Sequence, residues 1–164
     1  MRRLLSLCLL AIASNSVAEP PAVRLDSIAY DDLAAEISRL KGRVVLVDVW
    51  GEFCGPCKKK MPSVVALHTK HGRQGLAVVT VSVDPPDDSD ARAAAKAFLA
   101  KHGATCRNVI LSDSPTVWQA KWKAEAVPLV FLFDREGRLV QKWADKFEIT
   151  EVEKRVAKLM ADGP

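Results

Sequence analysis

An apolar, β-branched run from Val44 to Val49 leads within a few residues into two cysteines, Cys54 and Cys57. Nearly continuous apolar runs are typical of strands that are buried on both faces of a parallel sheet. Gly55 and Pro56 separate the cysteines, and they supply a turn and a φ angle that suits the first residues of a helix. The run therefore predicts a buried strand, a tight turn and a helix that begins near Cys54.

This placement favours redox chemistry at the cysteine pair. A thiol at a helix N-terminus lies near unpaired N–H groups, so we expect Cys54 to ionise more readily than a free cysteine. Thiolate attacks disulfides, and Cys57, one turn further along, is placed to resolve the mixed disulfide. A structural disulfide and half of a metal site are the alternatives. The remaining cysteines, Cys8 and Cys106, form no second doublet that would complete a metal site.

Residues 48–58, with the sequence Asp-Val-Trp-Gly-Glu-Phe-Cys-Gly-Pro-Cys-Lys, resemble the active site of the thioredoxin family. Phe53 stands where that family has its second tryptophan. Three later segments, which are 76–84, the predicted helix ending at His102 and 131–140, resemble exported thiol-disulfide oxidoreductases of the TlpA and ResA type. The resemblance covers roughly residues 26–159.

The order of predicted elements agrees with this resemblance. Helices are predicted at 31–40, 54–70, 89–102 and 115–123, strands at 76–83, 107–111, 129–133 and 138–142, and a terminal helix opens at a capping-box pattern in 150–153. Strands interleaved with helices and followed by a hairpin predict an α/β fold. The resemblance implies a thioredoxin-like fold, with a mixed central β-sheet flanked by helices and an inserted helix after the second strand.

The resemblance also implies several site residues. Pro128 matches the cis-proline that faces the cysteine pair in thioredoxin-like folds; an ordinary trans proline at a strand start is the alternative. The expected substrate-binding residues are Trp50, Phe53, Gly55, Pro56 and Val127, with Phe53 more exposed and Trp50 more packed. Phe53 and the pair Leu129-Val130 depart from the family pattern, so the contacts with substrate are not carried over.

Asp48 lies six residues before Cys54, within the apolar run. If Asp48 is buried there, desolvation raises its pKa and makes it a proton acceptor for Cys57. The resemblance implies the same role. A carboxylate that reaches solvent at the strand end is the alternative.

The first residues predict export. Arg2 and Arg3 precede an apolar run from Leu4 to Ala13, and a small-residue site ends at Ala18. We therefore expect residues 1–18 to be a signal peptide and residues 19–164 to form one thioredoxin-like domain, periplasmic or otherwise exported. The run is shorter than the ~20 residues that span a bilayer, although an uncleaved anchor is the alternative. Without its two leading arginines the chain is nearly neutral, which argues against nucleic-acid binding.

These features predict an exported thiol-disulfide oxidoreductase that reduces protein disulfides. Its task can be the preparation of protein thiols for haem attachment. We expect disulfide-containing protein substrates, a membrane-bound electron donor, a monomeric chain, and neither cofactor nor metal. One alternative is a copper-binding thioredoxin-like chaperone module that holds Cu(I) with the two thiolates and a histidine. Another is a peroxidase that uses a single reactive cysteine. Cys106 is expected to be a small buried side chain rather than a regulatory thiol.

Overall fold

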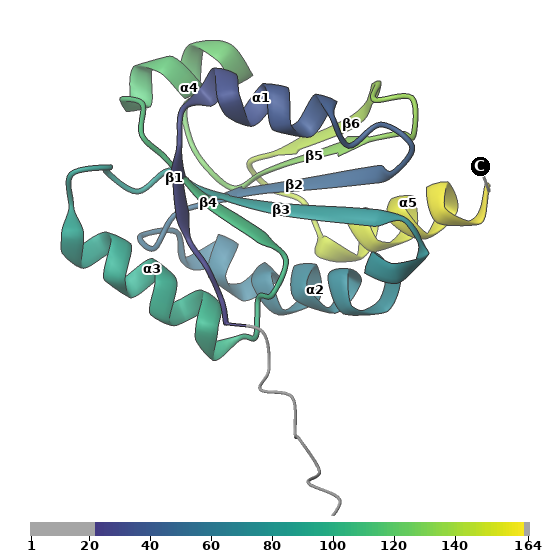
Figure 1. The fold of residues 1–164 in the computed structure, drawn as a ribbon, viewed down its shortest axis with the longest axis horizontal. Coiled ribbons are helices and arrows are strands. Elements are labelled where there is room, and N and C mark those ends of the chain that lie inside the picture. The colour runs from purple at the N-terminus through teal and green to yellow at the C-terminus, as the bar shows by residue number, and fades with distance from the viewer. Residues whose placement is uncertain (1–21, 163–164) are drawn as a thin grey trace, which may run out of the picture.

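A six-stranded mixed sheet forms the centre of the fold (Figure 1). The computed structural model describes residues 22–162, so the predicted signal peptide lies outside the described residues. The strands are β1 (Asp26–Ile28), β2 (Val44–Trp50), β3 (Leu76–Ser82), β4 (Arg107–Leu111), β5 (Leu129–Phe133) and β6 (Leu139–Ala144). Their order in the sheet is β1-β4-β3-β2-β5-β6. Strands β1, β4, β3 and β2 are parallel, β5 is antiparallel to β2, and β6 is antiparallel to β5.

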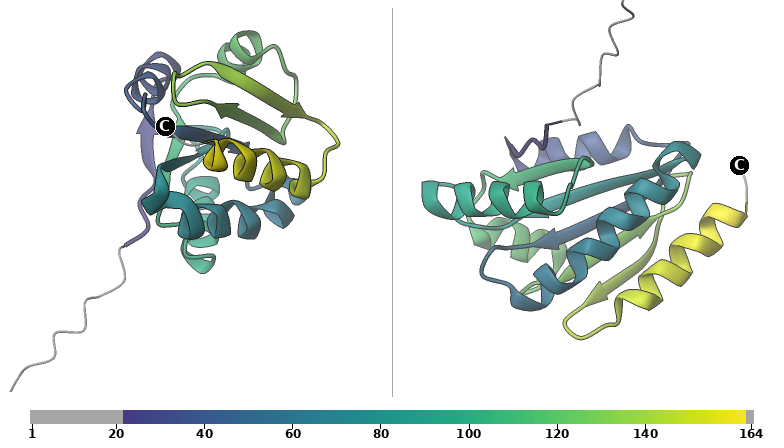
Figure 2. Two further views of the ribbon diagram at one scale, coloured as in Figure 1. Left: turned by 90° about the vertical axis from the view of Figure 1, so that its right-hand side faces the viewer. Right: turned by 90° about the horizontal axis from the view of Figure 1, so that it is seen from below.

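Helices cover both faces of this sheet, as the two rotated views in Figure 2 show. On one face lie α1 (Tyr30–Ser38) and α4 (Pro115–Trp122), and on the other lie α2 (Gly55–His71), α3 (Ser89–Lys101) and α5 (Ile149–Ala161). A short 3-10 turn, Gly72–Gln74, follows α2. The predicted architecture is therefore confirmed: a mixed sheet lies between two helical layers, and α3 is the helix expected after the active-site strand and its neighbour.

The central strand β2 is buried along its whole length. Because side chains alternate along a strand, Leu46 and Trp50 pack under α2, α3 and α5, whereas Val45, Val47 and Val49 face α1 and α4. Asp48 shares the face of Leu46 and Trp50. The apolar run is thus buried from both sides, which is the reason for its continuous hydrophobicity.

Two local features differ from the sequence prediction. Strand β1 was not predicted, because it has only three residues, which are exposed or half-buried, and its strand state depends on parallel pairing with β4. The capping box expected at 150–153 is wrong. Helix α5 begins one residue before Thr150, its N-cap is Glu148, and no side chain caps it. In the β5–β6 turn, Gly137 has φ +80°, a conformation that glycine adopts without strain.

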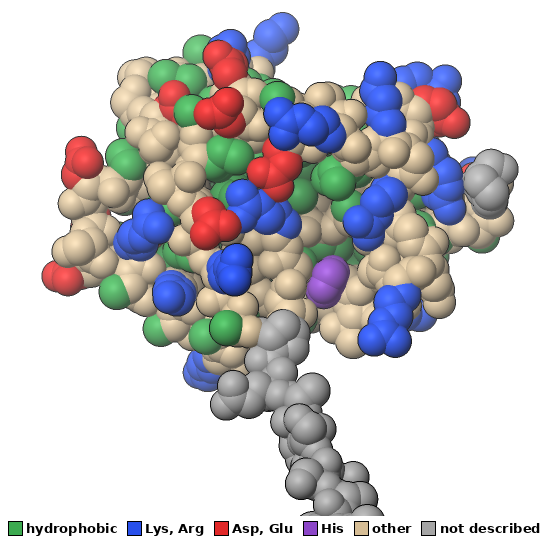
Figure 3. Space-filling view, viewed as in Figure 1, with side chains coloured by type: hydrophobic (Ala, Val, Ile, Leu, Met, Phe, Trp, Pro, Cys, Tyr) green, Lys and Arg blue, Asp and Glu red, His purple; other side chains and the backbone are tan. Residues whose placement is uncertain are grey.

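The surface is mixed in charge. The face shown in Figure 3 carries both Lys or Arg and Asp or Glu side chains. Among residues 22–162, no helix has the length and apolar character needed to cross a bilayer.

Candidate active site

The cysteine pair lies where β2 ends and α2 begins. Cys54 is the N-cap of α2, and Cys57 lies in its first turn. The two sulfurs form a disulfide, and both side chains are buried, with 6% of Cys54 and 1% of Cys57 exposed. The Cys57 N–H donates to Cys54 Sγ over 3.2 Å. The predicted position of Cys54 at a helix N-terminus is confirmed. On reduction, this N–H and the helix dipole would stabilise a Cys54 thiolate.

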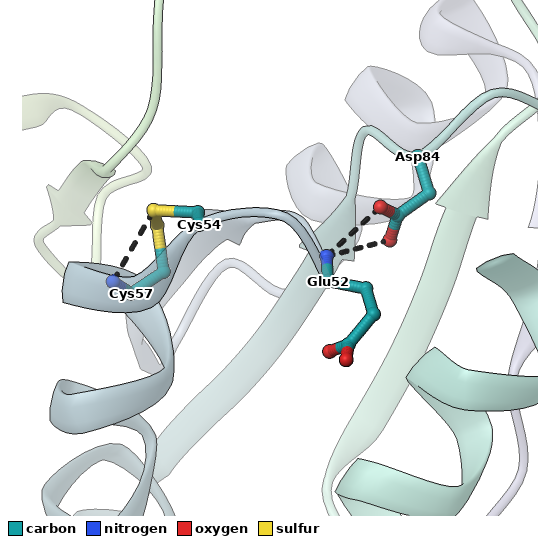
Figure 4. The surroundings of a disulfide bond; sticks show 4 residues. All are labelled: Glu52, Cys54, Cys57 and Asp84. Carbon is teal, nitrogen blue, oxygen red and sulfur yellow. Dashed lines mark hydrogen bonds between the residues drawn. A yellow bond between two sulfur atoms is a disulfide. The ribbon is translucent and has the colours of Figure 1, made fainter.

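A buried carboxylate just after the neighbouring strand β3 holds the loop before Cys54 (Figure 4). Asp84, only 2% exposed, accepts the Glu52 N–H through both oxygens, at 2.8 and 3.1 Å. Ser82 donates its hydroxyl to the same carboxylate over 2.6 Å. Glu52 in turn pairs with Lys58 of α2 over 2.9 Å. Glu52 therefore connects the loop to the segment after β3 through its backbone N–H, and to the helix that carries the cysteines through its side chain.

Pro128 lies beside the end of β2. The Val127–Pro128 bond is cis, as the resemblance implied. In the antiparallel register Leu129 is opposite Val49, so Pro128 falls at the level of Trp50, the last residue of β2. Pro128 is buried and Val127 is half-buried. A proline here places no backbone N–H beside the cysteine loop.

The other predicted substrate-binding residues separate into exposed and buried ones. Gly55 and Pro56 are exposed, and Phe53 is the most exposed large apolar side chain described, at 69%. The Phe53 ring lies against Gly51, where an added Cβ would be 2.5 Å from the ring. Trp50 is fully buried and contacts the Phe98 ring at a centroid distance of 5.4 Å. Phe53 and the Gly-Pro turn therefore form the accessible surface beside the cysteine pair, and Trp50 packs in the core beneath this surface.

Asp48 is buried beneath α2, with 2% of the residue exposed. Burial raises its pKa from 3.8 to about 7, and the positive charge of Lys60 on α2 opposes part of that rise. Among the described residues, its Oδ2 atom has no hydrogen-bond partner. Cys57 belongs to the same buried cluster as Leu46 and Trp50, which flank Asp48 on its face of β2. A carboxyl with this pKa can exchange a proton near neutral pH.

A buried polar row continues from Asp48 across the sheet and was not predicted. Asp48 is paired in register with Thr80, which is paired with Asn108. The Thr80 hydroxyl donates to Asn108 Oδ1 over 2.8 Å, and the Cys106 thiol donates to the same oxygen over 3.4 Å. Burial raises the pKa of Cys106 to about 12. The prediction that Cys106 is a buried side chain is confirmed, and it is a free thiol.

Asp84, Thr80 and Asn108 were missed because their positions beside the site depend on which strands are neighbours. A signal for Asp84 was available: it follows a predicted strand directly and precedes two prolines. In a parallel sheet, the carboxyl end of that strand meets the carboxyl end of β2 at the same edge.

The described residues offer no cluster of three or more His, Cys, Asp or Glu side chains that could hold a metal ion. His68 lies in α2 roughly 16 Å along the helix axis beyond Cys57. His102 is the C-cap of α3, a helix that starts at the active-site edge and runs away from it. A histidine ligand for copper beside the cysteine pair is therefore not provided by these helices.

We expect Asp84→Ala to lower both stability and turnover. The Glu52 N–H would be left buried without its acceptor, at a cost of about 1–3 kcal/mol. The loop before Cys54 would also lose its anchor. Urea unfolding and disulfide-reduction assays would measure the two effects.

Asp134→Ala is the matched control for this change. Asp134 is another buried carboxylate that accepts backbone N–H groups in a turn, from Glu136 and Arg138, but it lies in the β5–β6 hairpin. This variant should be destabilised without a loss of turnover in the folded protein. Equal loss of turnover in both variants would show that Asp84 acts only through global stability.

Comparison with known proteins agrees with this geometry. The thiol-disulfide oxidoreductase ResA of Bacillus cereus is 27% identical over 107 residues, which are 65% of this chain and 58% of that protein. This chain thus matches less than two thirds of that relative. The thiol:disulfide interchange protein HelX of Rhodobacter capsulatus is 26% identical over 144 residues, 87% of this chain and 76% of HelX.

A solved thioredoxin-like protein in its oxidised form superposes with a TM-score of 0.62 and 26% identity, covering 74% of this chain and 80% of that one. The fold is therefore thioredoxin-like. The sequence profile of the AhpC/TSA family matches residues 22–142, most of the chain and all of the site described above. The chain belongs to the AhpC/TSA family.

Proposed function

We propose that this protein is an exported thiol-disulfide oxidoreductase that reduces disulfides in protein substrates. The observation that carries the proposal is the Cys54–Cys57 disulfide at the N-terminus of α2, with Cys54 as the N-cap. Its relatives ResA and HelX, named as a thiol-disulfide oxidoreductase and a thiol:disulfide interchange protein, support the same chemistry.

The cycle begins with the dithiol form. Cys54 thiolate attacks one sulfur of the substrate disulfide, so that a mixed disulfide forms and the other substrate sulfur leaves as a thiolate. Asp48 accepts the proton of Cys57, and the Cys57 thiolate then attacks Cys54 Sγ. The substrate leaves with two reduced sulfurs, and the enzyme keeps a Cys54–Cys57 disulfide. Two electrons from an external reductant restore the dithiol.

The substrate would bind across the exposed turn. Phe53 offers an apolar surface next to the cysteines, and Gly55 and Pro56 leave the turn open. Backbone groups of Val127 could pair with an extended segment of the substrate in strand-like fashion. A substrate segment that is extended and partly apolar fits this surface best.

The direction of reaction, the location and the electron supply are also part of the proposal. The Gly-Pro turn between the cysteines resembles that of reducing family members, and the predicted signal peptide supports export to a periplasmic or similar compartment. A reductase there needs electrons from outside the compartment. We therefore propose a membrane-bound electron donor. We also propose that the enzyme is monomeric.

We expect Cys57→Ser to trap the mixed disulfide. Without the resolving thiol, Cys54 would remain bonded to the substrate sulfur, and mass spectrometry would find one substrate per enzyme after reaction with an oxidised protein. The double variant that also carries Cys54→Ser is the control and should give no adduct. A peroxidase would behave differently: Cys57→Ser would consume peroxide quickly through Cys54 alone, and no substrate adduct would accumulate.

A further inference from the structure

An apolar groove lies on the face of the sheet opposite the cysteine pair. Its volume is about 520 Å³, and it is bounded by α1, α4 and the β5–β6 hairpin. Its walls are apolar side chains from all three, among them Leu33, Ile37, Trp122, Phe131 and Phe133. Ligand sites of this size are typically apolar, with a few polar groups that fix orientation.

The polar groups of the groove are almost all positive. Lys41, Lys121, Lys123 and Lys142 line it, and none of its lining residues, all within the described chain, carries a carboxylate. Lys121 has one exposed acidic partner outside the groove, Asp31, at 3.3 Å.

Two of these lysines are already engaged and two are not. Lys142 donates to the Trp122 carbonyl over 2.8 Å, so its charge caps the end of α4. Lys121 pairs with Asp31, as described above. The ammonium groups of Lys41 and Lys123 form no ion pair with any residue in 22–162, and both residues are exposed. The stem of Lys41 lies along the hairpin, near the position that a Cβ of Gly137 would occupy. Two uncompensated ammonium groups therefore border an apolar cavity.

We propose that this groove binds an elongated apolar molecule with a single carboxylate, namely a medium-chain fatty acid. The chain would lie between α1 and β5, and the carboxylate would lie at the lysine-bordered rim. The groove is separate from the cysteine pair, so a test of fatty-acid binding does not depend on the proposed redox function.

Charge and position argue against two other occupants. The first is the N-terminal segment: the described chain enters on the other face of the sheet, because Val23 and Leu25 pack in the cluster under α2 and α3. A second copy would present the same lysine-bordered groove, and a symmetric contact would oppose these charges.

Titration of the full chain with sodium decanoate and with decylammonium chloride, both below micelle formation, would test the proposal by calorimetry. We expect decanoate to bind about tenfold more tightly, because the interaction of the head group with the positively charged rim turns from attractive to repulsive in decylammonium. Amide NMR shifts should concentrate on α1, α4 and β5. Equal affinity for the two head groups, no binding, or shifts centred elsewhere would overturn the proposal.

Variants that remove lysine charges test whether the rim binds the carboxylate. The double variant Lys41→Gln, Lys123→Gln should weaken decanoate binding about fivefold. Lys96→Gln with Lys101→Gln removes the same charge from exposed positions on α3, at the other face, and should leave binding unchanged. An equal loss of decanoate affinity in both double variants would contradict a specific site in the groove. Nuclear Overhauser contacts between residues 1–21 and the groove, or a dimer that decanoate dissociates, would assign the groove to another occupant and also overturn it.

Discussion

Cys54→Ser is expected to abolish disulfide reduction, lowering turnover by roughly a thousandfold or more, because the attacking thiolate is lost. The fold should survive this change. Cys54 is the N-cap of α2, and serine is among the best N-cap residues, so the helix start is kept. The assay follows reduction of a disulfide-bonded protein by the enzyme with excess dithiothreitol, and circular dichroism checks the fold.

Cys106→Ala is the matched control for this loss. It removes the one described cysteine outside the pair, which is buried and whose acceptor, Asn108, keeps its bond from Thr80. Its turnover should equal that of the parent. Substantial turnover in Cys54→Ser, or its loss in Cys106→Ala, would contradict the assignment of the nucleophile.

Asp48→Asn is expected to slow resolution of the mixed disulfide about a hundredfold at pH 8. Burial raises the pKa of Asp48 to about 7, so the carboxylate that accepts the Cys57 proton forms as the pH rises through neutrality. In rapid-mixing experiments, the parent rate should rise through about pH 7, and the variant should lack this inflection. An unchanged rate and pH profile would remove Asp48 from the mechanism.

The same residue predicts a dependence of stability on pH. The folded pKa of Asp48, about 7, lies above its ordinary value of 3.8, so its contribution is most favourable below pH 4 and is lost as the pH rises through 7. The full effect corresponds to ~4 kcal/mol as an upper bound. Urea unfolding should therefore show the stability of Asp48→Asn, relative to the parent, increasing between pH 4 and pH 8. If the difference in unfolding free energy between the variant and the parent does not change with pH, the pKa of Asp48 is not raised in the folded protein.

Much of the site could be predicted because its signals are local. The β-branched apolar run ending at Trp50 is typical of a strand buried inside a parallel sheet, and Gly-Pro between the cysteines favours a turn into a helix. These two features place Cys54 at a helix N-terminus and Asp48 inside the protein. The exposure of Phe53 follows from its place in the turn.

The parts that could not be predicted depend on neighbours distant in sequence. Asp84 holds the loop only because β3 lies beside β2, and the polar row from Asp48 through Thr80 to Asn108 exists only in that register. Strand β1 has no apolar pattern of its own and forms by pairing with β4. In each case the contact depends on the strand order, which a single run of residues does not contain.

The reduction potential of the Cys54/Cys57 pair tests the central claim most directly. The protein would be equilibrated in glutathione or dithiothreitol buffers of defined ratio, and its free thiols counted, with Cys106→Ala used to remove the third thiol. A reversible transition near the ~−270 mV of thioredoxin would support a reductase that receives electrons from a donor. A value near the ~−120 mV of the strong oxidant DsbA, or a pair that does not cycle, would contradict it.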